Sequence, residues 1–310
     1  MYSLYIRANR IERLPKNFDR LENLSILTLR SNKLTELPSV IGNFKNLIQL
    51  DASYNRLQTL PIEFKNVKTM KMLDLQQNQI NHLPDDIFEN MPDLYKLGLK
   101  NNKLSELPSS LTKTKVDHLN VESNLIKEVQ AGVIVGIKKL LAINISRNGL
   151  ESVPFEDGPF QWPNLQNLSL EYNEITSVPI GCFDECEGLH QVSFKENMIE
   201  VLPFDLVNWK NIIDLNLSGN LLKELPSAIG ELISLEYFNV SQNQIKKIPT
   251  SIGKLEKLKD FDLDENEIET LPTDIGQLKQ LKNLNLNNNL LTTLPNAIIC
   301  TYNLKLRSGN

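Results

Sequence analysis

Few residues in this sequence have the types and spacing that catalysis or metal binding needs. Cys182 and Cys186 lie four residues apart, and Cys300 is far along the chain. A structural zinc site takes four thiolate or imidazole ligands, and no second pair accompanies these thiols. No phosphate-binding loop or hydrolase motif occurs, and the three histidines are widely separated: His82, His118 and His190. We expect no enzyme activity, no cofactor and no metal.

Clustered carboxylates are the other residues that could take part in catalysis, as a general acid and a general base. Asp260, Asp262, Asp264 and Glu265 fall within one short stretch. A general acid and a general base need environments that separate their pKa values, and nothing in this stretch indicates such an asymmetry. A solvated acidic face is the simpler interpretation, and the question becomes which elements present it.

An asparagine recurs along the whole chain in the frame LxxLxLxxNxL, most often at intervals of 23 residues. This period and pattern are typical of a leucine-rich repeat, in which each unit adds one short strand. We predict an α/β repeat fold: a single horseshoe-shaped solenoid domain over residues 1–310. It would have about thirteen repeats, a concave parallel sheet and an irregular or 3-10 convex side. The asparagines are expected to form a structural ladder: Asn9, Asn32, Asn55, Asn78, Asn102, Asn124, Asn148, Asn173, Asn197, Asn220, Asn243, Asn266 and Asn289.

One regular repeat, residues 24–46, shows what each position must do. Alternation of apolar and polar residues around Thr28 predicts a short strand, and Pro38 prevents that strand from continuing. The Asn32 amide can satisfy backbone groups that the turn leaves unpaired. The predicted inward positions of this repeat are Leu24, Leu27, Leu29, Leu34, Leu37, Ile41 and Phe44.

The repeats are irregular around residues 125–197, where the return arms lengthen and Gly158-Pro159 lies in an insertion. A local change of curvature is expected, and a bend that separates two binding surfaces is the alternative. Neither end reads as the polar cap that a solenoid needs. We expect a fragment or an incomplete gene model, the alternative being capping through dimerisation.

Composition restricts the partners and the compartment. The net charge of −5 disfavours a nucleic-acid binder, and no apolar run is long enough to span a membrane. The first residues show no signal-peptide core, and three cysteines do not make a disulfide framework. These features predict a cytoplasmic protein without direct membrane insertion.

The positions six, four, two and one residues before each asparagine should point outward from the sheet. They are largely basic or neutral in the first five repeats and acidic in the last four. A face this polar suits protein recognition with electrostatic specificity better than a small-molecule pocket.

Four stretches resemble the Shoc/Sur (suppressor-of-clear) family of Ras-pathway leucine-rich-repeat scaffolds. They include LSILTLRSNKLTELPSVIG, the insertion with Gly158-Pro159, and FDLDENEIETLPTDIGQLKQL. The resemblance implies a non-enzymatic scaffold that binds a GTP-loaded Ras-type GTPase and a type-one protein phosphatase catalytic subunit. Through them it would act indirectly on Raf kinase and promote MAP kinase signalling.

The resemblance also implies site residues. The GTPase would contact Arg7, Arg30, Gln76, Gln77, Lys96 and Lys100, and the phosphatase would contact Tyr54, Asp262, Asp264 and Glu265. Lysine stands at 96 and 100 where the family tends to have arginine, which removes bidentate contacts. The alternative is a general intracellular leucine-rich-repeat adaptor with other partners.

Overall fold

The computed structural model of the chain describes residues 1–130, 132–153, 162 and 164–300. The Gly158-Pro159 insertion and the last ten residues, 301–310, lie outside the described residues. The chain divides into two compact units, residues 1–149 and residues 150–310. We describe each unit by itself, and the expectation of a single domain over 1–310 stays a prediction.

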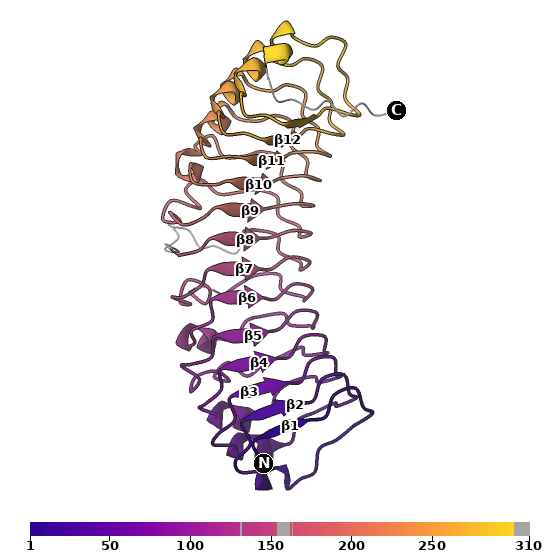
Figure 1. Cartoon of the computed structure of the whole chain (residues 1–310), viewed down its shortest axis with the longest axis vertical. Helices are drawn as coiled ribbons and strands as arrows, with labels where there is room; N and C mark the ends of the chain where they lie inside the picture. Colours follow the sequence, from indigo (N-terminus) through magenta and orange to yellow (C-terminus); the bar gives the residue numbers. More distant parts are fainter. Residues whose placement is uncertain (131, 154–161, 163, 301–310) are drawn as a thin grey trace. The chain divides into compact units, whose positions relative to one another are not determined.

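Each repeat contributes one three-residue strand, and neighbouring strands of a unit pair in parallel in chain order (Figure 1). The strands of the first unit are β1 (Ser3–Tyr5), β2 (Ile26–Thr28), β3 (Gln49–Asp51), β4 (Met72–Asp74), β5 (Lys96–Gly98), β6 (His118–Asn120) and β7 (Ala142–Asn144). Those of the second are β8 (Asn167–Ser169), β9 (Gln191–Ser193), β10 (Asp214–Asn216), β11 (Tyr237–Asn239), β12 (Asp260–Asp262) and β13 (Asn283–Asn285). The leucine-rich-repeat fold predicted from the period is confirmed.

The return arms carry short 3-10 helices, and the described residues contain no α-helix. A proline in extended conformation precedes six of these helices, as Pro38 does before η2. Its fixed φ ends the extended segment and starts the tight turn. The helices are η1 (Phe18–Arg20), η2 (Ser39–Asn43), η3 (Ile62–Asn66), η4 (Ser109–Lys113), η5 (Val207–Trp209), η6 (Ser227–Glu231), η7 (Thr250–Lys254), η8 (Thr273–Gln277) and η9 (Asn296–Cys300).

The core lies between the strands and the return arms. All seven inward positions predicted for the repeat at residues 24–46 are buried. Aromatic residues at some of these positions stack between repeats, and the rings of Phe238 and Phe261 are parallel with centroids 5.3 Å apart. Because no repeat buries its apolar side chains alone, stacking on the neighbour supplies the stabilisation.

Asparagine side chains tie neighbouring repeats together within each unit. The Oδ1 of each asparagine from Asn32 to Asn289 accepts a hydrogen bond from a backbone N–H of the preceding repeat. Asn220 is typical: it accepts from Ile199 N at 3.0 Å and donates Nδ2 to Phe194 O and Leu217 O, both at 3.0 Å. Asn9 is exposed and donates only to Arg7 O.

The residue before every ladder asparagine adopts a left-handed conformation, with φ between 51° and 58° at the non-glycine positions. Tyr54, Gln77 and Glu265 are among them, and Gly219 fills the same position in its repeat. This conformation turns the chain sharply after the strand and points the side chain outward. It costs roughly 1 kcal/mol or more at a non-glycine residue, which the adjoining asparagine hydrogen bonds offset.

Candidate binding surface

We call the side of each sheet that carries the outward strand residues its strand face, and the side with the 3-10 helices its return side. On the strand face, the first and third residues of each strand point away from the core, while the middle residue is buried in every strand from β2 to β13. The positions six and four residues before the asparagine therefore form two rows across each unit.

Two residues predicted to bind the GTPase are exposed on the strand face of the first unit. Arg7 is exposed after β1, and Lys96 is exposed at the start of β5. Arg30 lies over the Tyr54 ring, with its guanidinium carbon 4.5 Å from the ring centroid. Tyr54 therefore belongs to the first unit with Arg30, whereas the other residues predicted to bind the phosphatase belong to the second.

Lys100 is held by a carboxylate of its own unit. Its Nζ lies 2.7 Å from Glu122 Oε2, and Arg147 Nε lies 3.9 Å from Glu122 Oε1. The Asn144 amide also donates to Glu122 Oε2 at 3.2 Å. A partner that used Lys100 would have to displace this network.

A hollow of about 380 Å³ opens on the strand face over β3–β6. Gly98 makes room for it, because a Cβ at that position would come within 2.6 Å of Asp74 Oδ1. Burial raises the pKa of the Asp74 carboxyl, and Asp51 raises it further, against hydrogen bonds from the backbone and side chain of Gln76 that lower it. Gln76 thus orients Asp74, and the adjoining Gln77 is exposed.

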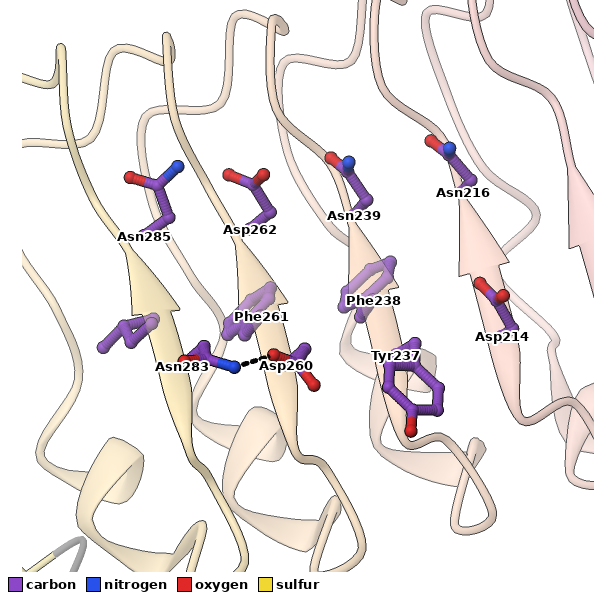
Figure 2. A pocket seen from close by; sticks show the side chains of 11 residues that line it. Asp214, Asn216, Tyr237, Phe238, Asn239, Asp260, Phe261, Asp262, Asn283 and Asn285 are labelled. Carbon is purple, nitrogen blue, oxygen red and sulfur yellow. Dashed lines mark hydrogen bonds between the residues drawn. The ribbon is translucent and has the colours of Figure 1, made fainter. Parts of the chain in front are cut away.

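A second hollow, of about 360 Å³, opens on the strand face over β10–β13. Figure 2 shows two rows of side chains across it. The row at the strand starts is Asp214, Tyr237, Asp260 and Asn283, and the row at the strand ends is Asn216, Asn239, Asp262 and Asn285. Asn283 donates a hydrogen bond to Asp260, and Gln191 Nε2 donates to Asp214 at 3.2 Å. No lysine, arginine or histidine is among the described residues that line the hollow.

The row at the strand ends also has a structural task that the sequence pattern did not reveal. The side-chain oxygen of an aspartate or asparagine there accepts the backbone N–H two residues later, as Asp262 does from Asp264 at 3.1 Å. The same contact recurs at Asp51, Asp74, Asn120, Asn144, Asn216, Asn239 and Asn285. The alternation of aspartate and asparagine at this position was the available signal, since both residues cap turns of this kind.

Two carboxyl groups of the second hollow are partly desolvated. Burial raises the pKa of Asp214, against the hydrogen bond from Gln191 that lowers it. Burial also raises the pKa of Asp262, and the neighbouring Asp264 raises it further. Asp264 accepts from Asn288 Nδ2 at 3.0 Å, and Glu265 from Gln242 Nε2 at 3.3 Å. The acidic residues predicted here therefore lie together on one strand face.

The residues first considered for catalysis are dispersed. His118 lies at the start of β6, His82 follows an asparagine turn, and His190 precedes β9. Within the parts of the chain that the structure describes, no three His, Cys, Asp or Glu side chains gather to hold a metal ion. No helix among those same residues has the length and apolar character to cross a membrane.

Cys182 and Cys186 are buried, and Cys300 is exposed. Burial raises the pKa of both buried thiols, that of Cys186 to about 11. A buried thiol with a raised pKa is protected from oxidation. The free state of these two buried cysteines is therefore compatible with either redox compartment.

The fold and the strand face are those of a repeat protein that serves for protein interaction, and comparison with known families supports the same class. The pattern described as "Leucine rich repeat" matches residues 1–57, 53–104, 68–114 and 163–222, more than half of the chain, and "Leucine-rich repeat region" matches residues 215–305. The chain belongs to the leucine-rich-repeat family.

Its relatives include osteomodulin of Bos taurus, 27% identical over 164 residues, and lumican of Gallus gallus, 30% identical over 166 residues. These matches cover 44% and 46% of this chain but only 38% and 48% of the relatives, so the chain matches less than half of either protein. Among solved structures, a leucine-rich-repeat protein of Leptospira interrogans is 30% identical with a TM-score of 0.79, covering 94% of this chain and 79% of that one. The ectodomain of an Arabidopsis thaliana receptor kinase, in complex with Casparian strip integrity factor 2, is 26% identical with a TM-score of 0.80, covering 98% and 38%.

Two predictions are wrong in the light of these relatives. The resemblance to the Ras-pathway scaffold family is overturned by the similarity to osteomodulin, lumican and biglycan. The stretches that carried it consist largely of repeat consensus, which specifies the fold and not the partner. The cytoplasmic localisation is overturned as well, because these relatives are secreted proteins of the extracellular matrix.

Proposed function

We propose that this chain is a protein-binding module whose strand faces contact its partners. The observation that supports the proposal is the pair of hollows, one on the strand face of each unit, whose linings include outward polar side chains. The ladder asparagines are occupied in holding repeats together, whereas the outward rows of the strand face extend across several repeats. Leucine-rich-repeat proteins of this kind are typically binding proteins without catalytic activity, and the similar plant ectodomain is in complex with Casparian strip integrity factor 2.

The test compares variants of the two sides in a capture experiment with immobilised protein. Lys96→Glu and Tyr237→Ala alter exposed strand-face residues, one in each unit. Lys68→Glu and Ile233→Ala alter exposed residues that follow η3 and η6 on the return side. Proteins retained by the wild type should be lost with a strand-face variant and kept by both return-side variants. The opposite pattern would show that the return side is the binding surface.

The finer identification of the partner stays an untested prediction. A GTP-loaded Ras-type GTPase with a type-one phosphatase was implied by the resemblance alone, and the engagement of Lys100 with Glu122 does not favour it. Calorimetry with the GTPase loaded with a GTP analogue or GDP, with and without phosphatase, is the direct test. Binding that required the GTP form would identify the partner despite the different relatives.

A further inference from the structure

The strand face over β10–β13 has a chemical character that limits what can bind there. Three carboxylates, those of Asp214, Asp260 and Asp262, line the hollow, and Asp264 and Glu265 follow at the end of β12. The lysine nearest along the chain, Lys259, is engaged elsewhere, because its Nζ lies 2.5 Å from Glu236 Oε2. The polar contacts to Asp214 and Asp260 come from the neutral amides of Gln191 and Asn283. The negative charge of this face is therefore balanced by no cation among the lining residues.

The spacing of the carboxylates distinguishes a small ion from an extended ligand. Asp214 and Asp260 lie two strands apart, which is about 10 Å in a β-sheet, and Asp260 and Asp262 are two residues apart on one strand, about 6.5 Å. A metal ion needs its ligands to converge within 2–3 Å of one point, whereas these groups spread across the hollow. Side chains on one face of an extended peptide recur every second residue, about 6.5 Å apart, so two cationic side chains there would match the separation of Asp260 and Asp262.

Tyr237 adds an aromatic surface at the edge of the same hollow (Figure 2). Its side chain is exposed. Outward tyrosines elsewhere in this chain already stack with cations: Arg30 over Tyr54, and Lys195 with its Nζ 5.7 Å from the Tyr172 ring centroid. A cation on the Tyr237 ring would gain the same attraction, while the carboxylates beside it would accept its hydrogen bonds.

We propose that the hollow over β10–β13 binds an extended segment of a partner protein that carries lysine or arginine side chains. This inference rests on the proposed function and specifies the partner for the second unit. The negative charge of the hollow favours a positively charged segment. Burial has removed part of the water around the carboxylates, and the cationic side chains would replace that lost hydration with ion pairs.

The repeats themselves supply isosteric variants for the test. At the two positions of Asp260 and Asp262, the next repeat has Asn283 and Asn285. Asn285 caps its turn as Asp262 does, through Oδ1 to the backbone N–H of Asn287. The double variant Asp260→Asn with Asp262→Asn therefore removes two charges and keeps both shapes and the turn contact. The control, Glu256→Gln with Glu269→Gln, removes two charges from exposed residues outside the hollow.

The probe is a short fluorescent peptide in which arginine and serine alternate, and the matched peptide has citrulline in place of arginine. We expect the wild type to bind the arginine peptide and not the citrulline peptide. The hollow variant should bind the arginine peptide at least about tenfold more weakly, and the control variant should bind like the wild type. Thermal melting of both variants checks that they are folded.

Two results would overturn the inference: no binding of the arginine peptide to the wild type, or equal affinity in the wild type and the hollow variant. Either result leaves the proposed function to its own test. If capture still depends on strand-face residues, only the cationic character of the partner is wrong. If the strand-face variants also capture the same proteins as the wild type, both the inference and the proposed function are wrong.

Discussion

At the scale of single residues, Asp262 has two roles that oppose each other. Its carboxylate caps the turn through the Asp264 N–H, and it also brings a partly buried negative charge next to the Asp264 carboxylate. Asparagine in the neighbouring repeats performs the capping without the charge. Compared with asparagine, an aspartate at this position adds negative charge to the strand face and lowers the free energy of unfolding.

This conflict predicts that Asp262→Asn stabilises the protein at neutral pH. Because the folded state raises the pKa of Asp262, it holds the proton more tightly than the unfolded chain. The contribution of the Asp262 carboxyl to the free energy of unfolding is therefore fully present below its unfolded pKa. This contribution is lost as the pH rises through its folded pKa. We expect a gain of less than about 1 kcal/mol in the variant at pH 7, because the half-exposed charge is screened.

Urea unfolding at neutral and acidic pH measures the effect. The curves of the wild type and of Asp262→Asn should converge under acidic conditions, where the wild-type carboxyl is protonated. A constant difference at all pH values would show that the charge is not its cause.

The asparagine ladder gives a second prediction at this scale. Asn220→Ala removes a buried side chain and leaves the Ile199 N–H without its acceptor. The Phe194 and Leu217 carbonyls each lose one of two donors, because Asn197 and Asn243 still donate to them. The unsatisfied N–H and the lost hydrogen bonds between repeats make us expect a loss of about 2–4 kcal/mol in the free energy of unfolding. Asn9→Ala is the control, since Asn9 is exposed and has one hydrogen bond. It should cost less than about 1 kcal/mol, and equal losses in the two variants would contradict this role of the ladder.

At the scale of elements, glycines let successive 3-10 helices stack closely. A Cβ on Gly230 in η6 would lie 2.7 Å from the carbonyl oxygen of Ser251 in η7. Because that obstacle is backbone, it cannot move aside as a flexible side chain would. Lys65 occupies the corresponding position in η3 and pairs with Asp86 instead, so the glycine is required only where the neighbouring backbone is this close.

We therefore expect Gly230→Ala to destabilise the second unit by about 1–3 kcal/mol through overpacking. Gly149→Ala is the matched control, because its Cβ would meet only Lys127 Cγ at 3.5 Å. That control should change stability by less than about 1 kcal/mol. Differential scanning calorimetry compares both variants, and similar melting temperatures would disprove the close-stacking explanation.

The strands and the inward positions could be predicted from the sequence, because the period of 23 residues places each leucine in the same environment. The hollows could not. The hollow beside Asp74 exists because residue 98, in the next repeat, is a glycine, and such contacts join residues far apart in the sequence. The capping role of Asp262 was also hidden, since its position is outward and reads as a binding residue.

At the scale of the whole molecule, the repeat pattern determined the architecture but misled on identity. Leucine, asparagine and proline at consensus positions are needed by any such solenoid, so similarity built on them carries no information on partners or compartment. What is particular to this chain is its outward rows, with Arg7 and Lys96 on the first unit and unbalanced carboxylates on the second.

This charge distribution predicts that binding at the second unit depends on salt. Affinity for the arginine peptide should fall steadily as ionic strength rises from about 0.05 M to about 0.5 M, because the Debye length shortens from roughly 14 Å to roughly 4 Å. Fluorescence anisotropy across a sodium chloride series measures it. Affinity that did not change with salt would indicate apolar contacts and not charge.

The most direct test of the central claim, that partners bind the strand face, is site-specific photo-crosslinking. A photoreactive phenylalanine analogue would replace Tyr237 on the strand face or Ile233 on the return side, both exposed residues of the second unit. We expect partner crosslinks from position 237 and none from position 233 in the same extract. Crosslinks from position 233 alone would place the partner on the return side and contradict it.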